Sequence, residues 1–470
     1  IFSHGGFVNV ANSTFTNTKS ERTGEFLGGG GSICSFDGSV NVTDSTFTDT
    51  NAGNMGGSIY SWSTEGTVTV TNSTFTNTTA GQGGAVYTYG GNVTVSDSSF
   101  TNTRGDAGAI FLEGDKNATI SNSRFTNIQS TEEGGAIEVT GSGSVSIFNS
   151  TFTNTTSGKD GGAISTEISN LFISNCTFND TTARDGAGGA IYSWSANITV
   201  SNSNFVNSIA SKNGGAIYVD NNCSVIVSNS TFTDTTSDMY GGAITGYNVT
   251  VIDSTFKNTT ANYSGAISGF DVNVIDSLFT NTKANNSGGA ITGFDVNVIG
   301  SNFINTIANN SGGAIYSHIG GISVTNSTFN NNMAGNDGGA IKGENVTVIS
   351  SSFIDNAAFG DGASIYASGL NLKDSTFNSP KADGSAIIHI KSSNNGTVNL
   401  NNNTIESNLP AIYNDGGIII SQTYLTFDNV TLYQGENATL TATLTDDKGN
   451  IIGSNTNVKG KVNGNNMDFI

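Results

Sequence analysis

One unit of about 26 residues recurs along most of this chain. Each copy holds one phenylalanine in the pattern S-x-F-x-N. The copies are marked by Phe15, Phe47, Phe75, Phe100, Phe125, Phe152, Phe178, Phe205, Phe232, Phe256, Phe279, Phe303, Phe329, Phe353 and Phe377, with Ile405 as the expected last member. A repeat of this period is typical of a solenoid, a propeller or an array. The repeat, and not the length of 470 residues, therefore sets the domain count.

Three segments of each unit carry the pattern of a short strand. The first alternates aliphatic and polar residues, as in Val93–Val95 and Ile198–Val200. The second alternates around the phenylalanine. The third reads Gly-Gly-Ala-Ile or Gly-Gly-Ala-Val in nine copies, with small residues at a turn before one large aliphatic residue.

These segments predict an all-β fold: a parallel β-helix of about 16 windings with three sheets, in which each strand pairs with its equivalent one winding later. At ~4.8 Å per winding the rod would be ~75 Å long. A β-propeller would need blades of about 40 residues or more. Leucine-rich repeats share the period, but this chain lacks the leucine and helix content that they need.

Equivalent positions of successive windings should then stack into ladders. We expect the phenylalanines to stack, and the Asn and Asp residues beside them to form bends, where their enclosed side chains bond to N–H groups of the bend. These structural ladders are represented by Phe75, Phe152, Phe205, Phe232, Asn77, Asn154, Asn202 and Asn229.

Alternation along the second segment predicts two faces. Ser73, Phe75 and Asn77 would share one face, and Thr74, Thr76 and Thr78 the outer one. Regular T-x-T faces resemble those of insect β-helical antifreeze proteins, so ice binding is an alternative function. We do not favour it, because Thr is a common exposed strand residue and the row is interrupted. The interruptions are Arg124, Ile128, Val206, Lys257, Leu278 and Ile304. The 24 N-x-S/T sequons make glycosylation plausible at solvent-facing copies.

The pattern changes near residue 423, so we expect a β-helix domain over 1–422 and a second module over 423–470. Strands are predicted at Val430–Tyr433, Ala438–Leu444 and Ile451–Ile452, with a hairpin turn at Asp447–Asn450. The module is too short for a complete sandwich of about 100 residues. Because Ile1 aligns with the middle of a winding, we interpret the chain as a piece of a longer protein.

Charge and cysteine content narrow the classes of partner. The chain has 37 acidic and 17 basic residues, a net charge of −20, and such a surface repels nucleic acid. The three cysteines are an odd number and occupy different repeat positions, so no disulfide framework is predicted. Cys176 replaces the usual serine of S-x-F and should be a small buried residue. No apolar run is long enough to span a bilayer.

Catalytic signatures are missing from the sequence. The histidines are His4, His318 and His389; the first two are equivalent but twelve windings apart, and no serine has a histidine partner in register. Nucleophilic catalysis would therefore lack a base.

Acidic and aromatic residues do coincide in adjacent windings. Asp271 and Asp295 are equivalent, and Tyr247, Phe270 and Phe294 should form an aromatic stack nearby. Stacked carboxylates repel one another unless a cation or a proton intervenes. These five residues are our candidate sugar-binding site; the alternative is a solvated acidic rim beside an aromatic ladder.

A second pair of equivalent carboxylates, Asp253 and Asp276, is the candidate metal site. Oxygen ligands of this kind suit Ca²⁺. No other cofactor is expected.

The pairing of Gly-Gly-Ala-Ile with F-x-N resembles the repeats of chlamydial polymorphic outer membrane proteins. It is still more similar to the adhesin-like surface proteins of methanogens, in which such repeats precede bacterial-type Ig-like modules, as VTLYQGENATLTATLTDDKGN does here. The resemblance implies a right-handed β-helix with a partial Ig-like β-sandwich. It also implies an extracellular, cell-surface location and a non-catalytic, adhesin-like function.

Within that resemblance we expect a monomeric rod. Its partners would be glycans or proteins on other cells, or a cell-wall polymer. The alternative is a polysaccharide lyase or hydrolase, because enzymes of the pectate-lyase class share the parallel β-helix.

Overall fold

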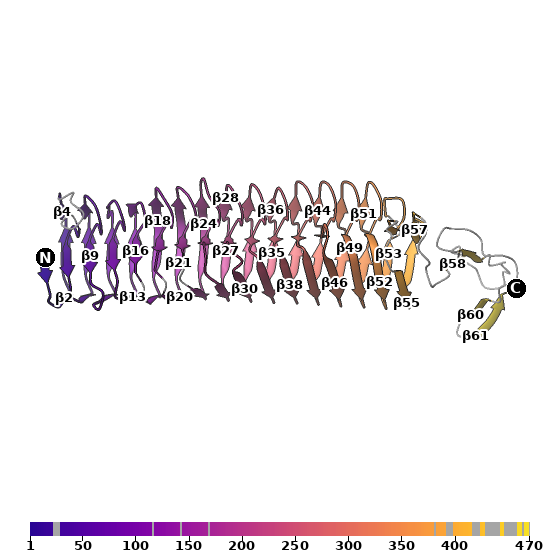
Figure 1. Ribbon diagram of the computed structural model, residues 1–470, viewed down its shortest axis with the longest axis horizontal. Helices are drawn as coiled ribbons and strands as arrows, with labels where there is room; N and C mark the ends of the chain where they lie inside the picture. Colours follow the sequence, from indigo (N-terminus) through magenta and orange to yellow (C-terminus); the bar gives the residue numbers. More distant parts are fainter. Residues whose placement is uncertain are drawn as a thin grey trace, which may run out of the picture.

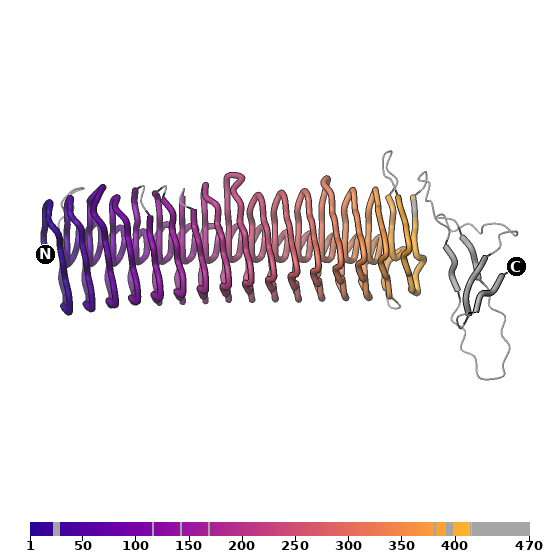
Figure 2. The backbone as a smooth tube through the Cα atoms, turned by 90° about the horizontal axis from the view of Figure 1, so that it is seen from below, coloured from indigo at the N-terminus to yellow at the C-terminus, as the bar shows by residue number. Residues whose placement is uncertain are grey.

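The protein is an all-β rod built from stacked windings, with no helix in the part that is described (Figure 1). The computed structural model describes residues 1–21, 29–114, 117–141, 143–167, 170–379, 382–391 and 398–415, and four strands beyond them. Viewed after a 90° turn, the same windings follow one another along a single axis (Figure 2).

One winding illustrates the repeat. It runs through β26 (Ile198–Ser201), β27 (Asn204–Val206), β28 (Ile209–Ala210) and β29 (Ile217–Val219). The three rows of strands expected from the sequence are present as β26, β27 and β29 and their equivalents. The two-residue strand β28 is an addition that the repeat pattern missed, because Ile209–Ala210 was taken as part of a turn.

All described strand pairs from β1 (Phe2–His4) to β57 (Ile412–Asn414) are parallel and join successive windings in register. Phe205 pairs with Phe178 on one side and with Phe232 on the other. The row of phenylalanines continues from β3 (Thr14–Thr16) to β56 (Thr404–Ser407), where Ile405 takes the expected last place. The stacked β-helix is thereby confirmed.

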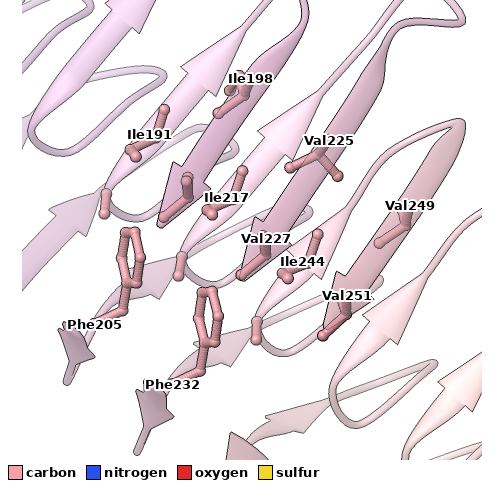
Figure 3. Close-up of a cluster of buried hydrophobic side chains, with 14 of the residues drawn as sticks. Ile191, Ile198, Phe205, Ile217, Val225, Val227, Phe232, Ile244, Val249 and Val251 are labelled. Atoms are coloured by element: carbon pink, nitrogen blue, oxygen red, sulfur yellow. The ribbon is translucent and has the colours of Figure 1, made fainter. Parts of the chain in front are cut away.

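The core lies inside the windings. Phe205 and Phe232 are completely buried, and their parallel rings are 4.7 Å apart between centroids. Figure 3 shows them with the aliphatic side chains of the other rows, such as Ile217 and Val227, which point into the same interior. Because each aliphatic or aromatic position sits over its equivalent, the core extends as one continuous cluster along the rod.

The bends around the phenylalanine strand use the left-handed backbone conformation. Asn202 has φ 49° and Asn207 has φ 52°, and most equivalents of both are also Asn or Asp. Asn and Asp adopt this conformation at lower cost than other residues with a Cβ atom. The positions of Asn77, Asn154, Asn202 and Asn229 in bend ladders are thus confirmed, and all four carry φ values between 46° and 55°.

The expected bonding within these bends was wrong in two respects. The N–H of Asn202 donates to the carbonyl of Ser228 in the next winding, at 3.1 Å, and not to a side chain. The four side chains are exposed, and two of them bond to their equivalents in the preceding winding: Nδ2 of Asn77 donates to Oδ1 of Asp49 at 2.9 Å, and Nδ2 of Asn154 to Oδ1 of Asn127 at 2.9 Å.

The bend also breaks the alternation that the sequence suggested. Asn77 was expected on the face of Phe75, but it is exposed, while Thr78, expected outside, is completely buried. The reason is the left-handed residue, which rotates the chain so that the next side chain points inward.

A buried serine ladder connects the windings. The hydroxyl of Ser230 accepts the N–H of Ser203 at 3.1 Å, and the hydroxyl of Ser203 donates to the carbonyl of Ser201 at 2.8 Å. Cys176 occupies this row, is 1% exposed, and its thiol contacts the carbonyl of Ser174, which confirms it as a buried substitute for serine. The three cysteines are free.

Beyond the windings, β58 (Tyr424–Phe427) pairs with β59 (Ala442–Thr445), and β60 (Val458–Val462) pairs with β61 (Asn465–Phe469). Both pairs are antiparallel. The predicted strands Val430–Tyr433 and Ile451–Ile452, the turn, and the boundary at 422 lie outside the described residues. The Ig-like interpretation of 423–470 therefore stays a prediction. No helix in the described part of the chain is long and apolar enough to cross a membrane.

Candidate functional site

A trough of about 570 Å³ crosses the outer face of five adjacent strands. Its strands are β34 (Asn248–Ile252), β38 (Asp271–Ile275), β42 (Asp295–Ile299), β46 (Gly321–Thr325) and the second half of β49 (Ile341–Ile349). Alternate residues of these strands are buried, and the others face outward. The outward residues form two rows along the rod: Asn248, Asp271, Asp295, Gly321 and Asn345, and Thr250, Asn273, Asn297, Ser323 and Thr347.

The polar groups of this trough are only partly paired. Nδ2 of Asn297 donates to Oδ1 of Asn273 at 2.8 Å, and the N–H of Gly321 donates to Oδ1 of Asp295 at 2.8 Å. Asp271 is the register partner of Asp295, and its carboxylate has no hydrogen bond to any described residue. The trough therefore offers free acceptors at one-winding spacing to a ligand that lies along the rod.

The predicted aromatic stack is present. The centroids of Tyr247 and Phe270 are 4.8 Å apart, those of Phe270 and Phe294 are 4.7 Å apart, and all three rings are parallel. The three side chains are 37–41% exposed. They lie one residue before the trough strands and do not line the trough.

Stacking also limits what these rings can bind. Inner ring faces are covered by the neighbouring rings, so a ligand lying along the rod meets ring edges, whereas a sugar that stacks on an aromatic residue needs a face. The structure thus brings Asp271 and Asp295 into one trough and leaves the aromatic stack at its border.

The candidate metal ligands Asp253 and Asp276 lie in exposed left-handed bends of adjacent windings, with φ 48° and 47°. The described residues contain no group of three or more His, Cys, Asp or Glu side chains that could hold a metal ion. Calcium takes six to eight oxygen ligands. The calcium hypothesis remains a prediction that rests on two carboxylates.

A second hollow, of about 480 Å³, was missed by the sequence analysis. We call it the acidic pocket; it is lined by Glu133, Asp160, Glu167, Tyr192 and Trp194. It borders the strands of the Gly-Gly-Ala-Ile row: β19 (Ile137–Val139), β22 (Ile164–Thr166) and β25 (Ile191–Ser193). The signal was weak because equivalent positions carry different residues in adjacent windings: Glu133 and Asp160 share one repeat position, and Glu167 and Trp194 share another.

The acidic pocket carries a strong negative field. Burial, followed by the nearby carboxylates of Glu133 and Glu167, raises the pKa of Glu138 on β19 to about 8. Burial also raises the pKa of Glu133, although the hydroxyl of Ser165 donates to its carboxylate at 2.9 Å. The adjacent cation Lys159 is paired with Glu132 on the surface.

Comparison with known families matches the model of the right-handed β-helix region to residues 1–158 and 108–261. These matches together span more than half of the chain. The chain belongs to the right-handed β-helix family. In this β-helix, residues 326–344 also match the repeat of the Chlamydia polymorphic membrane proteins. That stretch contains Phe329, Asn331 and the motif Gly338–Ile341, which is the pairing expected to carry the resemblance. No curated protein and no solved structure matches the chain.

A third hollow of the β-helix, of about 280 Å³, lies around Lys342. The ammonium of Lys342 is 2.8 Å from the carboxylate of Asp337 and 5.0 Å from the ring centre of Tyr366. His318 borders this hollow and contacts the hydroxyl of Tyr316 at 3.1 Å. The paired lysine gives this hollow little net charge.

One serine approaches a histidine of the same winding, although the two are not register partners. Oγ of Ser385 is 3.5 Å from Nδ1 of His389, which is too long for a firm hydrogen bond. Asp361 lies 3.4 Å from the same nitrogen, and Asp415 lies 3.3 Å from Nε2. The His389 ring therefore lies between two carboxylates, and the serine is beyond firm hydrogen-bond distance.

Proposed function

We propose that this β-helix is a non-catalytic, adhesin-like protein of the cell surface, whose trough binds its partner. The partner would be a glycan or protein on another cell, or a cell-wall polymer. The observation that carries this proposal is the trough itself, in which five windings contribute outward polar side chains to one hollow of about 570 Å³. A hollow of that volume lies in the range of ligand sites.

Other features support the same function. Each winding contacts its neighbours alone, so windings add length while the outward residues can vary without disturbing the core. The match to a repeat of polymorphic membrane proteins favours a surface location. A net charge of −20 disfavours nucleic acid as the partner.

A substitution at Gly321 tests this proposal. A Cβ atom on Gly321 would lie 3.5 Å from the nearest heavy atom, so Gly321→Trp fills the trough with little strain. We expect at least a tenfold loss of binding to glycan arrays and to whole cells. The matched control is Thr94→Trp, which adds the same bulk at an exposed position of β13 (Asn92–Ser96), on the same sheet. Equal binding by both variants would refute the trough as the binding site.

A polysaccharide lyase or hydrolase is the second candidate, and one observation favours it. Asp271 and Asp295 are register partners on adjacent strands, whose spacing of ~4.8 Å approaches the ~5–5.5 Å between the carboxyl groups of retaining glycosidases. Release of reducing sugar from pectin-like or host glycans, lost in Asp271→Asn and Asp295→Asn, would support the enzyme and overturn the non-catalytic proposal.

A further inference from the structure

The acidic pocket has the chemistry of a site for a positively charged organic group. Three carboxylates, those of Glu133, Asp160 and Glu167, line one hollow, and no Lys or Arg is among the described residues that line it. Oxygens of two of them are engaged: Glu133 accepts from Ser165 at 2.9 Å, and Oδ1 of Asp160 accepts the N–H of Ala187 at 2.6 Å. The side chain of Glu167 has no hydrogen-bond partner among the described residues.

The largely buried side chain of Tyr192 provides an independent sign of a ligand. Tyr192 is 7% exposed and lines the hollow, yet its hydroxyl bonds to no described residue. The hydroxyl itself is not fully buried, so its unused hydrogen-bonding capacity faces the hollow, where water or a ligand can reach it. The hydroxyl is therefore free to bond to a polar group of a ligand in the pocket.

Trp194 adds an aromatic surface to the carboxylates. Its indole is 50% exposed, lines the same hollow, and makes no ring contact with another described aromatic residue. Unlike the stacked rings beside the trough, it can offer a free face. Tryptophan is the best partner for a cation above a ring.

Carboxylates dominate the charge around the pocket, and Lys159, a cation that acts on Glu133, is paired with Glu132. Burial raises the pKa of Tyr192, and the carboxylates of Asp160 and Glu133 raise it further. A carboxylate cluster of this kind attracts cations. A metal ion is disfavoured, because no group of three or more acidic, His or Cys side chains in the described residues is placed to hold one.

From this combination we propose that the acidic pocket binds a protonated alkylamine, with the ammonium group beside the Glu167 carboxylate and over the face of Trp194. The Tyr192 hydroxyl would accept a hydrogen bond from the ammonium group. The site lies on other windings than the trough and does not depend on the function proposed for it.

Fluorescence of Trp194 gives a direct test in the full chain. The protein has two tryptophans, so Trp62→Phe leaves Trp194 as the sole indole. We would titrate this protein with spermidine, with a short peptide holding one lysine, with the same peptide acetylated on that lysine, and with calcium chloride. We expect saturable quenching by the two amines, with no response to the acetylated peptide.

Substitutions then locate the site. Glu167→Gln should weaken amine binding about tenfold, because it removes a charged hydrogen bond. The matched control Glu65→Gln removes an exposed carboxylate elsewhere and should change nothing. Calorimetry with Trp194→Ala provides a second variant, expected to bind at least fivefold more weakly.

Each outcome decides the proposal. Tighter binding of spermidine assigns a free polyamine, and tighter binding of the peptide assigns a lysine side chain; both support an ammonium site. The proposal would be overturned if neither spermidine nor the lysine peptide gave saturable quenching. It would also be overturned if the acetylated peptide bound as tightly as the unmodified one, or if Glu167→Gln bound the amines as tightly as the unchanged protein. Saturation by calcium that is lost in Glu167→Gln would also overturn it, in favour of a metal site.

Discussion

At the scale of single residues, backbone conformation explains the Asn and Asp residues that punctuate each repeat. Asn202 is held at φ 49°, and the equivalent Gly300 is held at φ 62°. Glycine is free in this region, Asn tolerates it, and a residue such as alanine does so at higher cost. The side-chain ladders are an addition to this requirement, since the bend N–H groups already bond to the next winding.

Asn202→Ala should therefore destabilise the β-helix by about 1 kcal/mol, because alanine in this conformation is strained. Asn202→Gly should be close to neutral, because glycine relieves the strain but is more flexible when unfolded. Chemical denaturation of both variants checks this. If Asn202→Ala and Asn202→Gly lost the same amount of stability, the Asn side chain, and not its backbone conformation, would determine the bend.

The carboxyl group of Glu138 makes stability depend on pH. Its pKa is raised from 4.5 to about 8 in the folded protein, so between these values the folded state holds a proton that the unfolded state has released. Stability should therefore fall as pH rises from about 4.5 to 8, and stay level above.

Glu138→Gln should remove this fall in stability with rising pH, because glutamine does not titrate. Because the side chain is partly exposed, we expect a gain of about 1–2 kcal/mol at pH 8, well below what the full pKa shift would imply. Near pH 4 the variant and the natural protein should be equally stable. Thermal unfolding across this range is the measurement, and a gain that is the same at pH 4 and pH 8 would exclude titration of Glu138 as its cause.

At the scale of strands, the phenylalanine row is the element that fixes register. The ring of Phe205 lies 4.7 Å from those of Phe178 and Phe232, and all are completely buried. A one-residue slip of β27 would turn this ring outward, because side chains alternate along a strand.

Phe205→Ala should lower the free energy of unfolding by about 3–5 kcal/mol, which is the usual loss when a buried phenylalanine is truncated. Phe205→Leu should cost less, since it leaves a smaller cavity. Because windings contact their neighbours alone, hydrogen exchange should accelerate first in β24 (Thr177–Ala183), β27 and β31 (Thr231–Thr233). Acceleration spread evenly along the rod would contradict this local coupling.

Period and alternation were sufficient to predict the strands that repeat without variation. Phe205 and its equivalents predicted one row, and the alternating aliphatic residues another. Ile209–Ala210 could not be recognised as strand β28, because two residues are too few for an alternation to appear. Thr78 was predicted to face outward because the strand alternation was assumed to continue through Asn77. The left-handed conformation of Asn77 ends that alternation, and it cannot be recognised from periodicity.

At the scale of the whole molecule, stacking explains which sites the sequence could predict. Asp271 and Asp295 were found because a ladder repeats the same residue in adjacent windings, and the trough brings them together. The acidic pocket was missed because its repeat positions do not keep one residue type: Glu167 is equivalent to Trp194, and Glu133 is equivalent to Asp160. Sites of that kind become visible when the turns of several windings are placed beside one another.

Both surface sites depend on windings that stack in register, and distances between spin labels test this directly. Thr94, Thr199, Thr250 and Asn297 face outward in one row, at four, six and eight windings from the first. In a background with the three cysteines changed to serine, labels at Thr94 and each other position should be ~19, ~29 and ~38 Å apart, at ~4.8 Å per winding. Distances that level off or fail to grow with the number of windings would contradict the stacked rod.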